Sequence, residues 1–317
     1  GTHMDLRQNV TQLSSGNYAE IGADLNFFPD RTELRFGNSN ITILEETWQI
    51  TDNNVVVFGD EKITIENLSV FNTDQSISFD GNIAIAQDTA QSLSIEFQEV
   101  EVANINPLAN ESYTGRVNGS IQAQNLYYNP LIFGDLSIEE FRINNFLVGD
   151  LEGSMSWNDY RERFDIDFDV DRLGRNTISM TGAFYPSRDE EQLNIDLLLN
   201  EANINIAEPY IDDYFSELGG FIDGRYKITG NTNAPVMKGL GAIKNGQMKI
   251  NYLNTKYSFN GDVDFQERYI SLENLQFLDA RSRQAQFSGR VSHNYFRDFR
   301  LDLIGQLNQF QVLNTNQ

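Results

Sequence analysis

Apolar and polar residues alternate strictly in two stretches of residues 219–265. Because successive side chains of a strand point to opposite faces, each stretch predicts a strand with one apolar and one polar face. Glycines stand among the large apolar residues, where they allow a sheet to bend or another group to approach closely. The apolar positions of the two stretches are Ile222, Gly224, Tyr226, Ile228 and Gly230, and Tyr257, Phe259, Gly261, Val263 and Phe265.

The same alternation recurs along most of the chain in short segments separated by turn residues, a spacing typical of all-β proteins. Residues 5–33 form a polar lead-in. Helical periodicity is confined to Glu208–Leu218, where Pro209 suits a first turn and Gly219-Gly220 a stop, so a short helix is expected there. The strand segments that follow the lead-in are Leu34–Phe36, Ile41–Leu44, Trp48–Ile50 and Val55–Phe58.

Short motifs recur at a spacing close to 100 residues, which indicates an internal repeat. An apolar-x-Gly-x-apolar segment occurs three times, centred on Gly81, Gly182 and Gly289. About two and a half units are expected, near residues 58–160, 161–265 and 266–317, each packing mainly on its neighbours. The other matches pair Gly115, Gly119, Pro130, Gly134 and Ile138 with Gly220, Gly224, Pro235, Gly239 and Ile243, Ile63–Leu68 with Ile270–Leu275, and Ala103–Asn106 with Ala202–Asn205.

The amino-acid composition disfavours several classes of function. The chain of 317 residues has no cysteine and a formal net charge of −23, which disfavours binding to nucleic acid and to anionic lipid headgroups. No apolar run is long enough to span a bilayer. Residues 1–4 are typical of a cloning scar, so the chain is expected to be a segment of a longer protein.

Candidate chemistry is sparse. Asp165–Asp171 begins like a calcium loop, but Val170 replaces the glycine of the sharp turn, so a strand with outward aspartates is favoured. The 46 acidic residues make close carboxylate pairs inevitable without singling out a glycosidase pair. His293 is expected on the surface of a turn. A phosphate loop requires its glycines to be followed by a helix start and a lysine. Neither follows the repeated glycines of this chain. No enzyme, metal or cofactor is therefore expected.

The apolar stripe is the remaining candidate site. It either belongs to an ordinary core filled by its own side chains, or lines an open trough for an apolar guest. Five glycines are expected to provide curvature or clearance: Gly81, Gly182, Gly224, Gly261 and Gly289. The residues expected to line a lipid groove are Ile77, Phe79, Ile83, Met180, Phe184, Tyr226, Ile228, Tyr257, Phe259, Val263, Phe287 and Val291.

Several of these motifs resemble the C-terminal region of the TamB family of AsmA-like, bridge-type lipid-transfer proteins, in its Bacteroidetes form. They are Gly220-x3-Gly224 with Pro235 and Gly239, Asn245-Gly246, Asn251–Phe259, Trp48-x-Ile50 with Val57-Phe58, and the closing Phe310–Thr315. The resemblance covers most of residues 34–317. It implies an inner-membrane-anchored protein that crosses the periplasm as a long β-taco groove. It also implies an outer-membrane partner of the BamA-like barrel class, called TamA or a lipidated relative.

The resulting expectation is an all-β, elongated and curved sheet over residues 34–317 with a hydrophobic concave face. Its expected function is to shield phospholipid acyl chains in transit between the inner and outer membranes. A second hypothesis is a scaffold whose sheet edges add strands of outer-membrane proteins during assembly, with a groove filled by its own side chains.

Overall fold

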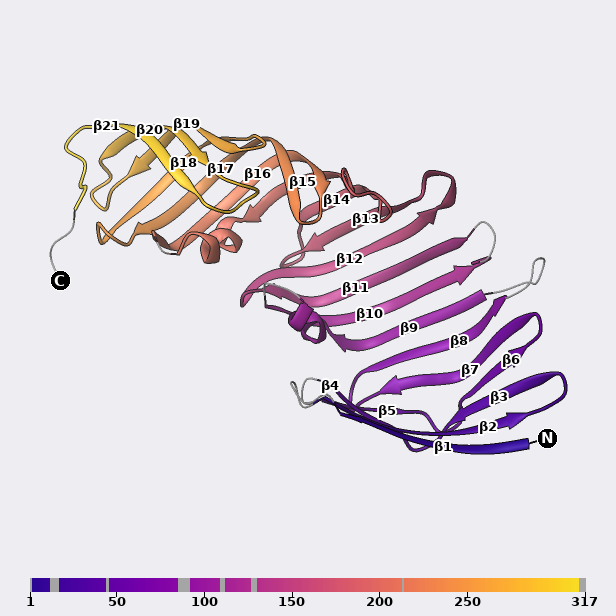
Figure 1. Cartoon of the computed structure of the whole chain (residues 1–317). Helices are drawn as coiled ribbons and strands as arrows, with labels where there is room; N and C mark the ends of the chain where they lie inside the picture. The colour runs from indigo at the N-terminus through magenta and orange to yellow at the C-terminus, as the bar shows by residue number, and fades with distance from the viewer. Residues whose placement is uncertain are drawn as a thin grey trace. The chain divides into compact units, whose positions relative to one another are not determined.

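The computed structural model describes residues 2–11, 17–43, 46–84, 92–108, 112–126, 130–212 and 214–313. In these residues the fold is all-β, as the alternation predicts, with 21 strands in antiparallel pairing and three short 3-10 helices. The chain divides into two compact units (Figure 1). Unit 1 comprises residues 1–141 and 152–162, and unit 2 comprises residues 142–151 and 163–317.

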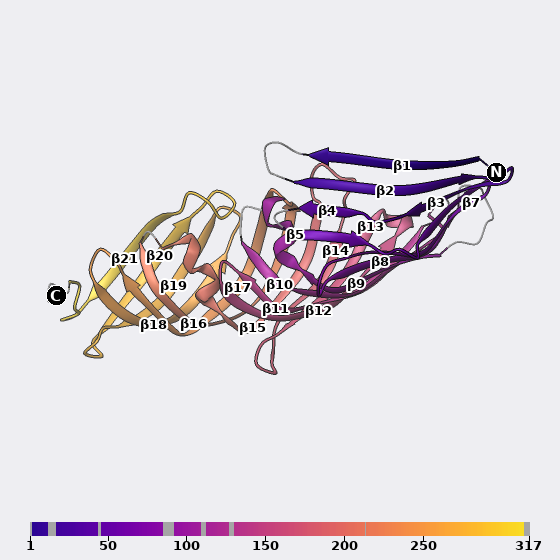
Figure 2. The same cartoon turned by 90° about the horizontal axis from the view of Figure 1, so that it is seen from below.

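Unit 1 is largely a meander, in which each strand from β6 to β10 pairs with the next along the chain. Near its start the ladder splits, because β2 pairs with β1, β3 and β4. Strands β1 and β2 lie at the N-terminal edge of this unit (Figure 2). The elements are β1 (Thr2–Thr11), β2 (Tyr18–Phe27), β3 (Arg31–Phe36), β4 (Asn40–Ile43), β5 (Glu46–Ile50), β6 (Val55–Gly59), β7 (Lys62–Phe71), β8 (Ser76–Ala84), β9 (Ser92–Glu101), η1 (Val102–Leu108), β10 (Tyr113–Gln124) and β11 (Leu131–Ile143).

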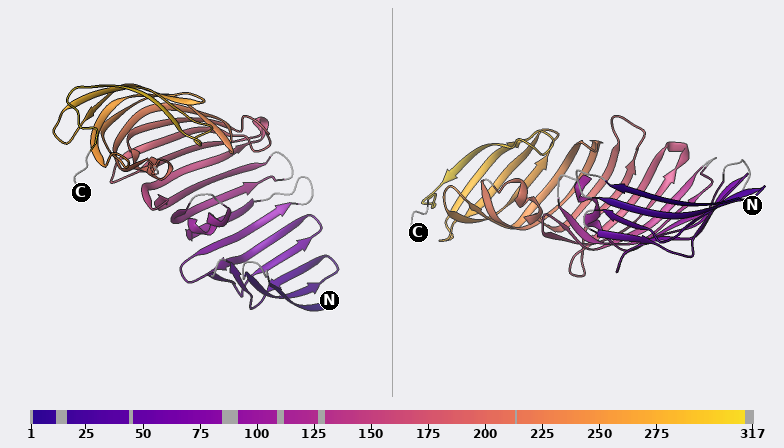
Figure 3. Two further views of the ribbon diagram at one scale, coloured as in Figure 1. Left: turned by 60° about the vertical axis from the view of Figure 1, so that its left-hand side comes forward. Right: turned by 60° about the horizontal axis from the view of Figure 1, so that its bottom comes forward.

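Unit 2 is an antiparallel meander from β13 to β21, in which each ladder between the described residues joins consecutive strands. The helical turn η3 packs against β16 (Figure 3). Strand β12 (Phe146–Asn158) is divided between the units, and η2 (Asp159–Arg161) belongs to unit 1. The remaining elements, all in unit 2, are β13 (Arg163–Asp171), β14 (Asn176–Phe184), β15 (Leu193–Asn203), η3 (Ile204–Tyr210), β16 (Phe215–Asn231), β17 (Ala234–Ile250), β18 (Thr255–Phe265), β19 (Tyr269–Leu278), β20 (Gln284–Ser292) and β21 (Arg300–Leu307).

Two sequence expectations need correction. The polar lead-in contains strands β1 and β2, whose ten ladder pairs form without a strongly apolar pattern. The expected helix at Glu208–Leu218 is displaced, because the helical turn η3 ends at Tyr210 and Phe215 already begins strand β16. The apolar positions Phe215 and Leu218 therefore belong to a strand. Asp213, within the expected helix, lies outside the described residues.

The internal repeat has a structural counterpart in the positions of β-bulges. Asn67 in β7 and Asn274 in β19, which occupy equivalent places in the repeated motif, both have a left-handed backbone with φ of 53° and 52°. The ladders shift register at both places. The motif repeated as Ala103–Asn106 and Ala202–Asn205 lies in both copies where a 3-10 helix follows a strand, since the first copy lies in η1 and Asn203 of the second caps η3. A bulge bends its strand and increases local twist, so the repeat carries the curvature of each unit.

Candidate apolar binding face

One face of the unit 2 sheet is apolar from β13 to β21, and we call it the apolar face. Directly opposed residues of paired strands lie on the same side of a sheet, so the register defines its members. A single row across nine strands runs Val170, Ile178, Leu199, Gly224, Gly241, Val263, Leu272, Gly289 and Leu303. The row beside it contains Phe168, Met180, Leu197, Tyr226, Gly239, Phe265, Ile270, Val291 and Leu301.

The apolar face is partly open to solvent along β13 to β15. Met180 and Phe184 of β14 are only half-buried there. On β15 the inward side chains of Leu193, Ile195, Leu197 and Leu199 are also half-buried. Leu198, which points to the opposite face of the same strand, is exposed by 42%. The β15 leucines are not among the groove residues expected from the sequence, although only Leu198 interrupts their alternation with polar residues.

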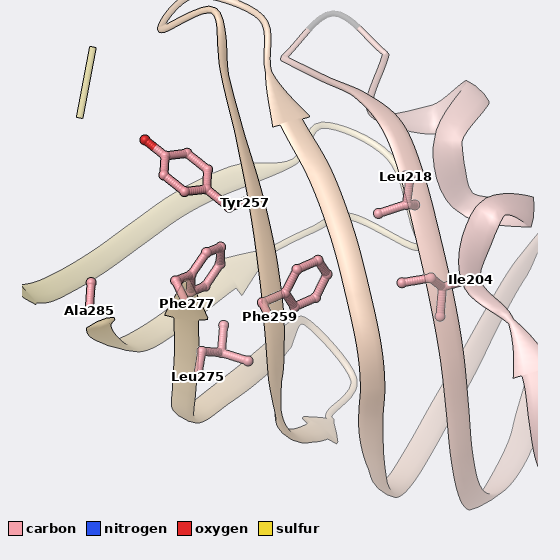
Figure 4. Packing of buried hydrophobic residues seen from close by; sticks show 7 residues of the cluster. All are labelled: Ile204, Leu218, Tyr257, Phe259, Leu275, Phe277 and Ala285. Atoms are coloured by element: carbon pink, nitrogen blue, oxygen red, sulfur yellow. The ribbon is translucent and has the colours of Figure 1, made fainter. Parts of the chain in front are cut away.

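Further along unit 2 the same face is closed by its own side chains. A cluster of buried residues projects from η3, β16, β18, β19 and β20 toward a common centre (Figure 4). Phe259 stacks on Phe277 with ring centroids 5.3 Å apart, and Phe277 meets Phe287 edge to face at 5.0 Å. The buried members are Ile204, Leu218, Tyr257, Phe259, Leu275, Phe277 and Ala285. The face therefore changes from half-open at β13–β15 to a packed core at β18–β20.

Glycines on the apolar face make room for aromatic rings of neighbouring strands. A Cβ atom added at Gly241 would meet the Tyr226 hydroxyl at 1.9 Å, and one added at Gly246 would meet the Phe259 ring at 2.7 Å. At Gly305 the corresponding distance, to the ring of Phe287, is 2.4 Å. The large side chains consequently lie flat over the glycines instead of standing up from the sheet.

Tyr226 lies between the open and closed parts of the face. Its side chain is buried, and its ring meets Phe265 edge to face at 5.3 Å. Its hydroxyl has no hydrogen-bond partner among the described residues. Burial, with a smaller contribution from the Asp223 carboxylate, raises the pKa of Tyr226 to about 12. The phenol is therefore neutral at physiological pH and adds no charge to the apolar face.

The segment that follows β21 crosses the end of the cluster. Phe310 stacks on Tyr257 at 5.1 Å, and the Tyr257 hydroxyl donates to the carbonyl oxygen of Gln311 at 2.9 Å. The Gln311 N–H donates in turn to the buried carboxylate of Asp279 at 2.9 Å. Burial alone would raise the pKa of Asp279, but bonds from Arg283, Gln311 and Arg281 outweigh it and lower the pKa to about 2. Asp279 stays ionised and holds this segment over the cluster.

The expected groove residues of unit 2 share the apolar face but differ in burial. Tyr226, Tyr257, Phe259 and Val263 are buried, and Phe287 packs against the cluster. The half-buried members are Met180, Phe184, Ile228 and Val291. The expected glycines Gly182, Gly224, Gly261 and Gly289 lie on the same face, since they oppose Ile195, Leu199, Ile243 and Leu272 respectively.

The remaining expected residues lie in unit 1. Ile77, Phe79 and Ile83 share one face of β8 with Gly81 and are half-buried. Phe79 lies in a row with Leu68, Ile95 and Ile121 across four strands. Unit 1 thus has its own half-buried apolar face, formed by the strand that repeats β14.

Two other sequence hypotheses concern possible chemistry. Asp165–Asp171 is strand β13, as the alternation predicts, with its apolar side chains in the rows of the apolar face. Asp169 accepts hydrogen bonds from Ser179 and Asn176, which lower its pKa. Within the described ranges, no group of three or more acidic or histidine side chains is arranged to hold a metal ion.

The expectation that His293 is a surface residue is wrong, since only 6% of the residue is exposed. Its ring stacks on Phe296 at 4.7 Å and its Nδ1 accepts from the Phe296 N–H at 3.2 Å. Burial, together with the Arg268 charge, lowers the pKa of His293. The turn after β20 folds aromatic residues over the imidazole, which the isolated Ser292–Tyr295 motif does not indicate.

No family model, curated protein or solved structure matches the chain. The part of the chain that the structure describes contains no helix long and apolar enough to cross a membrane. The chain is therefore identified by its class of fold, as an antiparallel all-β protein with a long apolar sheet face.

Proposed function

We propose that this chain shields the acyl chains of phospholipids along the apolar face, as a segment of a periplasmic bridge between the inner and outer membranes. The observation that supports the proposal is the half-buried row of β14 and β15. A two-chain lipid that leaves a bilayer exposes many methylenes, each costing about 0.8 kcal/mol in water. A face with successive rows of aliphatic side chains offsets that cost without any covalent chemistry.

The resemblance to TamB-like proteins agrees with this function and supplies its setting. In that setting the whole protein is anchored in the inner membrane and its partner is a BamA-like outer-membrane barrel. The acidic composition is compatible with an acyl-chain ligand, because the recognised part of the lipid is apolar and the headgroup stays in solvent. No residue is assigned a catalytic role.

The proposal is tested by purifying the chain from bacteria and measuring bound phospholipid by native mass spectrometry and by lipid analysis of an organic extract. Leu197→Glu places a carboxylate on the half-open part of the apolar face. Leu198→Glu is the matched control, since it places the same charge on the opposite face of β15. Loss of phospholipid in the Leu197 variant alone supports the proposal. Lipid-free wild-type protein, or equal binding by both variants, refutes it.

A further inference from the structure

Two neighbouring rows of the apolar face are interrupted by glycines between the half-open and the closed part. Where these rows cross β16 and β17, they consist of Gly224 and Tyr226 on β16 and, opposite them, Gly241 and Gly239 on β17. The ring of Tyr226 is therefore the only large side chain at these four positions. We call the three glycines Gly224, Gly239 and Gly241 the glycine floor.

The Tyr226 ring lies directly on the glycine floor. A Cβ atom added at Gly224 or Gly241 would lie 2.5 or 1.9 Å from the hydroxyl oxygen of Tyr226. One added at Gly239 would lie 2.9 Å from the ring atom Cδ1. Side chains of a strand ordinarily stand roughly perpendicular to the sheet, whereas this ring lies flat. It thus fills the space into which an apolar chain lying on the half-open leucines of β15 would continue.

The flat position leaves the Tyr226 hydroxyl without a hydrogen bond. Only 3% of the residue is exposed, and the oxygen has no partner among the described residues. Tyr257, another buried tyrosine of this face, donates its hydroxyl to the carbonyl oxygen of Gln311. Because an unpaired buried hydroxyl costs free energy, the flat position of Tyr226 is less stable than its apolar contacts alone would make it.

The side of the Tyr226 ring toward β15 lacks the packing that holds other rings over glycines. Phe259, which lies over Gly246, stacks on Phe277 within the buried cluster. Tyr226 meets Phe265 edge to face on the side of β18. On its other side lie the half-buried leucines of β15. The ring can therefore leave the floor without disrupting the buried cluster.

We infer that the glycine floor is a cryptic binding site for an acyl chain, which Tyr226 covers in this conformation and uncovers by turning upright. In the upright position the hydroxyl reaches solvent and regains hydrogen bonds. The acyl chain then lies on the three glycines, and the surface open to a lipid extends from β13–β15 across β16 and β17. The inference rests on the proposed function for its choice of ligand, and it adds a site and the residue that controls access to it.

The test uses two substitutions that affect a cover and a simple apolar contact in different ways. Tyr226→Phe keeps the ring and removes the unpaired hydroxyl, so it stabilises the covered state. It should weaken binding of diheptanoyl-phosphatidylcholine, a soluble short-chain phospholipid, about tenfold in calorimetric titration of the whole chain. Tyr226→Ala removes the cover and should bind at least as tightly as the wild-type protein. If the ring were only an apolar contact, phenylalanine would bind as well as tyrosine and alanine would bind worse.

Photocrosslinking shows where the acyl chain lies. A phosphatidylcholine with a diazirine at the end of one acyl chain should label residues 237–243 of β17 in the wild-type and Tyr226→Ala proteins, and label them less in Tyr226→Phe. This labelling, together with weaker binding by Tyr226→Phe, establishes the site.

Three results would overturn the inference. Equal or tighter phospholipid binding by Tyr226→Phe shows that the hydroxyl does not control access to the floor. Labelling confined to β13–β15 shows that the acyl chain does not reach the floor, and it leaves the acyl-chain proposal standing. Absence of phospholipid binding by the wild-type protein refutes both.

Discussion

Replacing the glycines of the repeated strands by alanine is expected to destabilise the sheet, and the effect can be measured at Gly182. This residue has φ of +153°, and an added Cβ atom would lie 2.2 Å from the carbonyl oxygen of Asn194 on the neighbouring strand. Gly81 and Gly289 are alike, with distances of 2.0 and 2.1 Å to the carbonyl oxygens of Ser92 and Asp302. Because the obstacle is backbone, the strand itself must move to admit a methyl group.

The matched control is Gly174, in the turn between β13 and β14. It too has a left-handed backbone, with φ of +76°, but an added Cβ atom there would meet no atom within 4 Å. Gly174→Ala should cost about 1 kcal/mol from backbone strain alone. Gly182→Ala should cost about 2 kcal/mol more, since overpacking typically adds 1–3 kcal/mol. That difference corresponds to a roughly 30-fold larger opening constant for the β14–β15 ladder.

Hydrogen exchange of peptides that cover β15 measures this local opening, so it does not require the two units to unfold together. Circular dichroism confirms that both variants retain strand structure. Similar exchange rates for the Gly182→Ala and Gly174→Ala proteins would refute the reasoning. They would show that the neighbouring strand yields to the methyl group at little cost, and that glycine serves there only to permit the backbone angle.

Two further predictions concern polar groups. Asp223→Ala should raise the hydrogen-exchange rate of the Glu201 amide about tenfold, because the bulge at Glu201 loses the acceptor of its N–H. Asp223→Asn keeps an oxygen at the site and should change that rate little. Equal effects of the two substitutions would contradict the role of Asp223 as acceptor. Burial holds the folded-state pKa of His293 below the value of about 6.5 expected in the unfolded chain, so protonation favours unfolding. Stability of the turn after β20 should be constant above pH 7 and fall as the pH drops through about 6.5. His293→Asn should remove that dependence between pH 7.5 and 5.5, as monitored by exchange of residues 293–299, and a persistent dependence would assign it to other groups.

The strands, and the face on which each of their side chains lies, can be predicted from alternation alone. A strand with one buried face has apolar residues at every second position. The N-terminal strands β1 and β2 escape that signal. Every residue of β1 is exposed, so no apolar period marks it. The displaced helix has a related cause: Phe215 and Leu218 are three residues apart and would lie on opposite faces of a regular strand, but the bulge at Glu217, with φ of 55°, brings both to one face. A left-handed residue changes the parity of a strand and imitates helical periodicity over a few positions.

Burial on the apolar face is harder to anticipate, because it depends on what lies above a row and not on the row itself. Leu197 and Phe259 have equally apolar neighbours along their strands, yet one is half-exposed and the other buried. The difference arises from segments distant in sequence. Phe310, some fifty residues after Phe259, helps to cover the cluster through its contact with Tyr257.

The sequence indicates only part of the structural role of the Asp-Gly and Asn-Gly dipeptides. Each glycine is visible in the sequence as a small residue in an apolar row, and its preceding Asp or Asn looks like an ordinary solvent-facing residue. The structure shows that the preceding residue accepts from the strand before it, while an added Cβ at Gly81, Gly119 or Gly224 meets the strand after it. The dipeptide therefore connects three strands. Such a unit specifies register, because a slip of one residue would remove the acceptor from the bulge and place a side chain against a backbone carbonyl. Repeating it along the chain keeps a meander of short-range pairings in register without a large enclosed core.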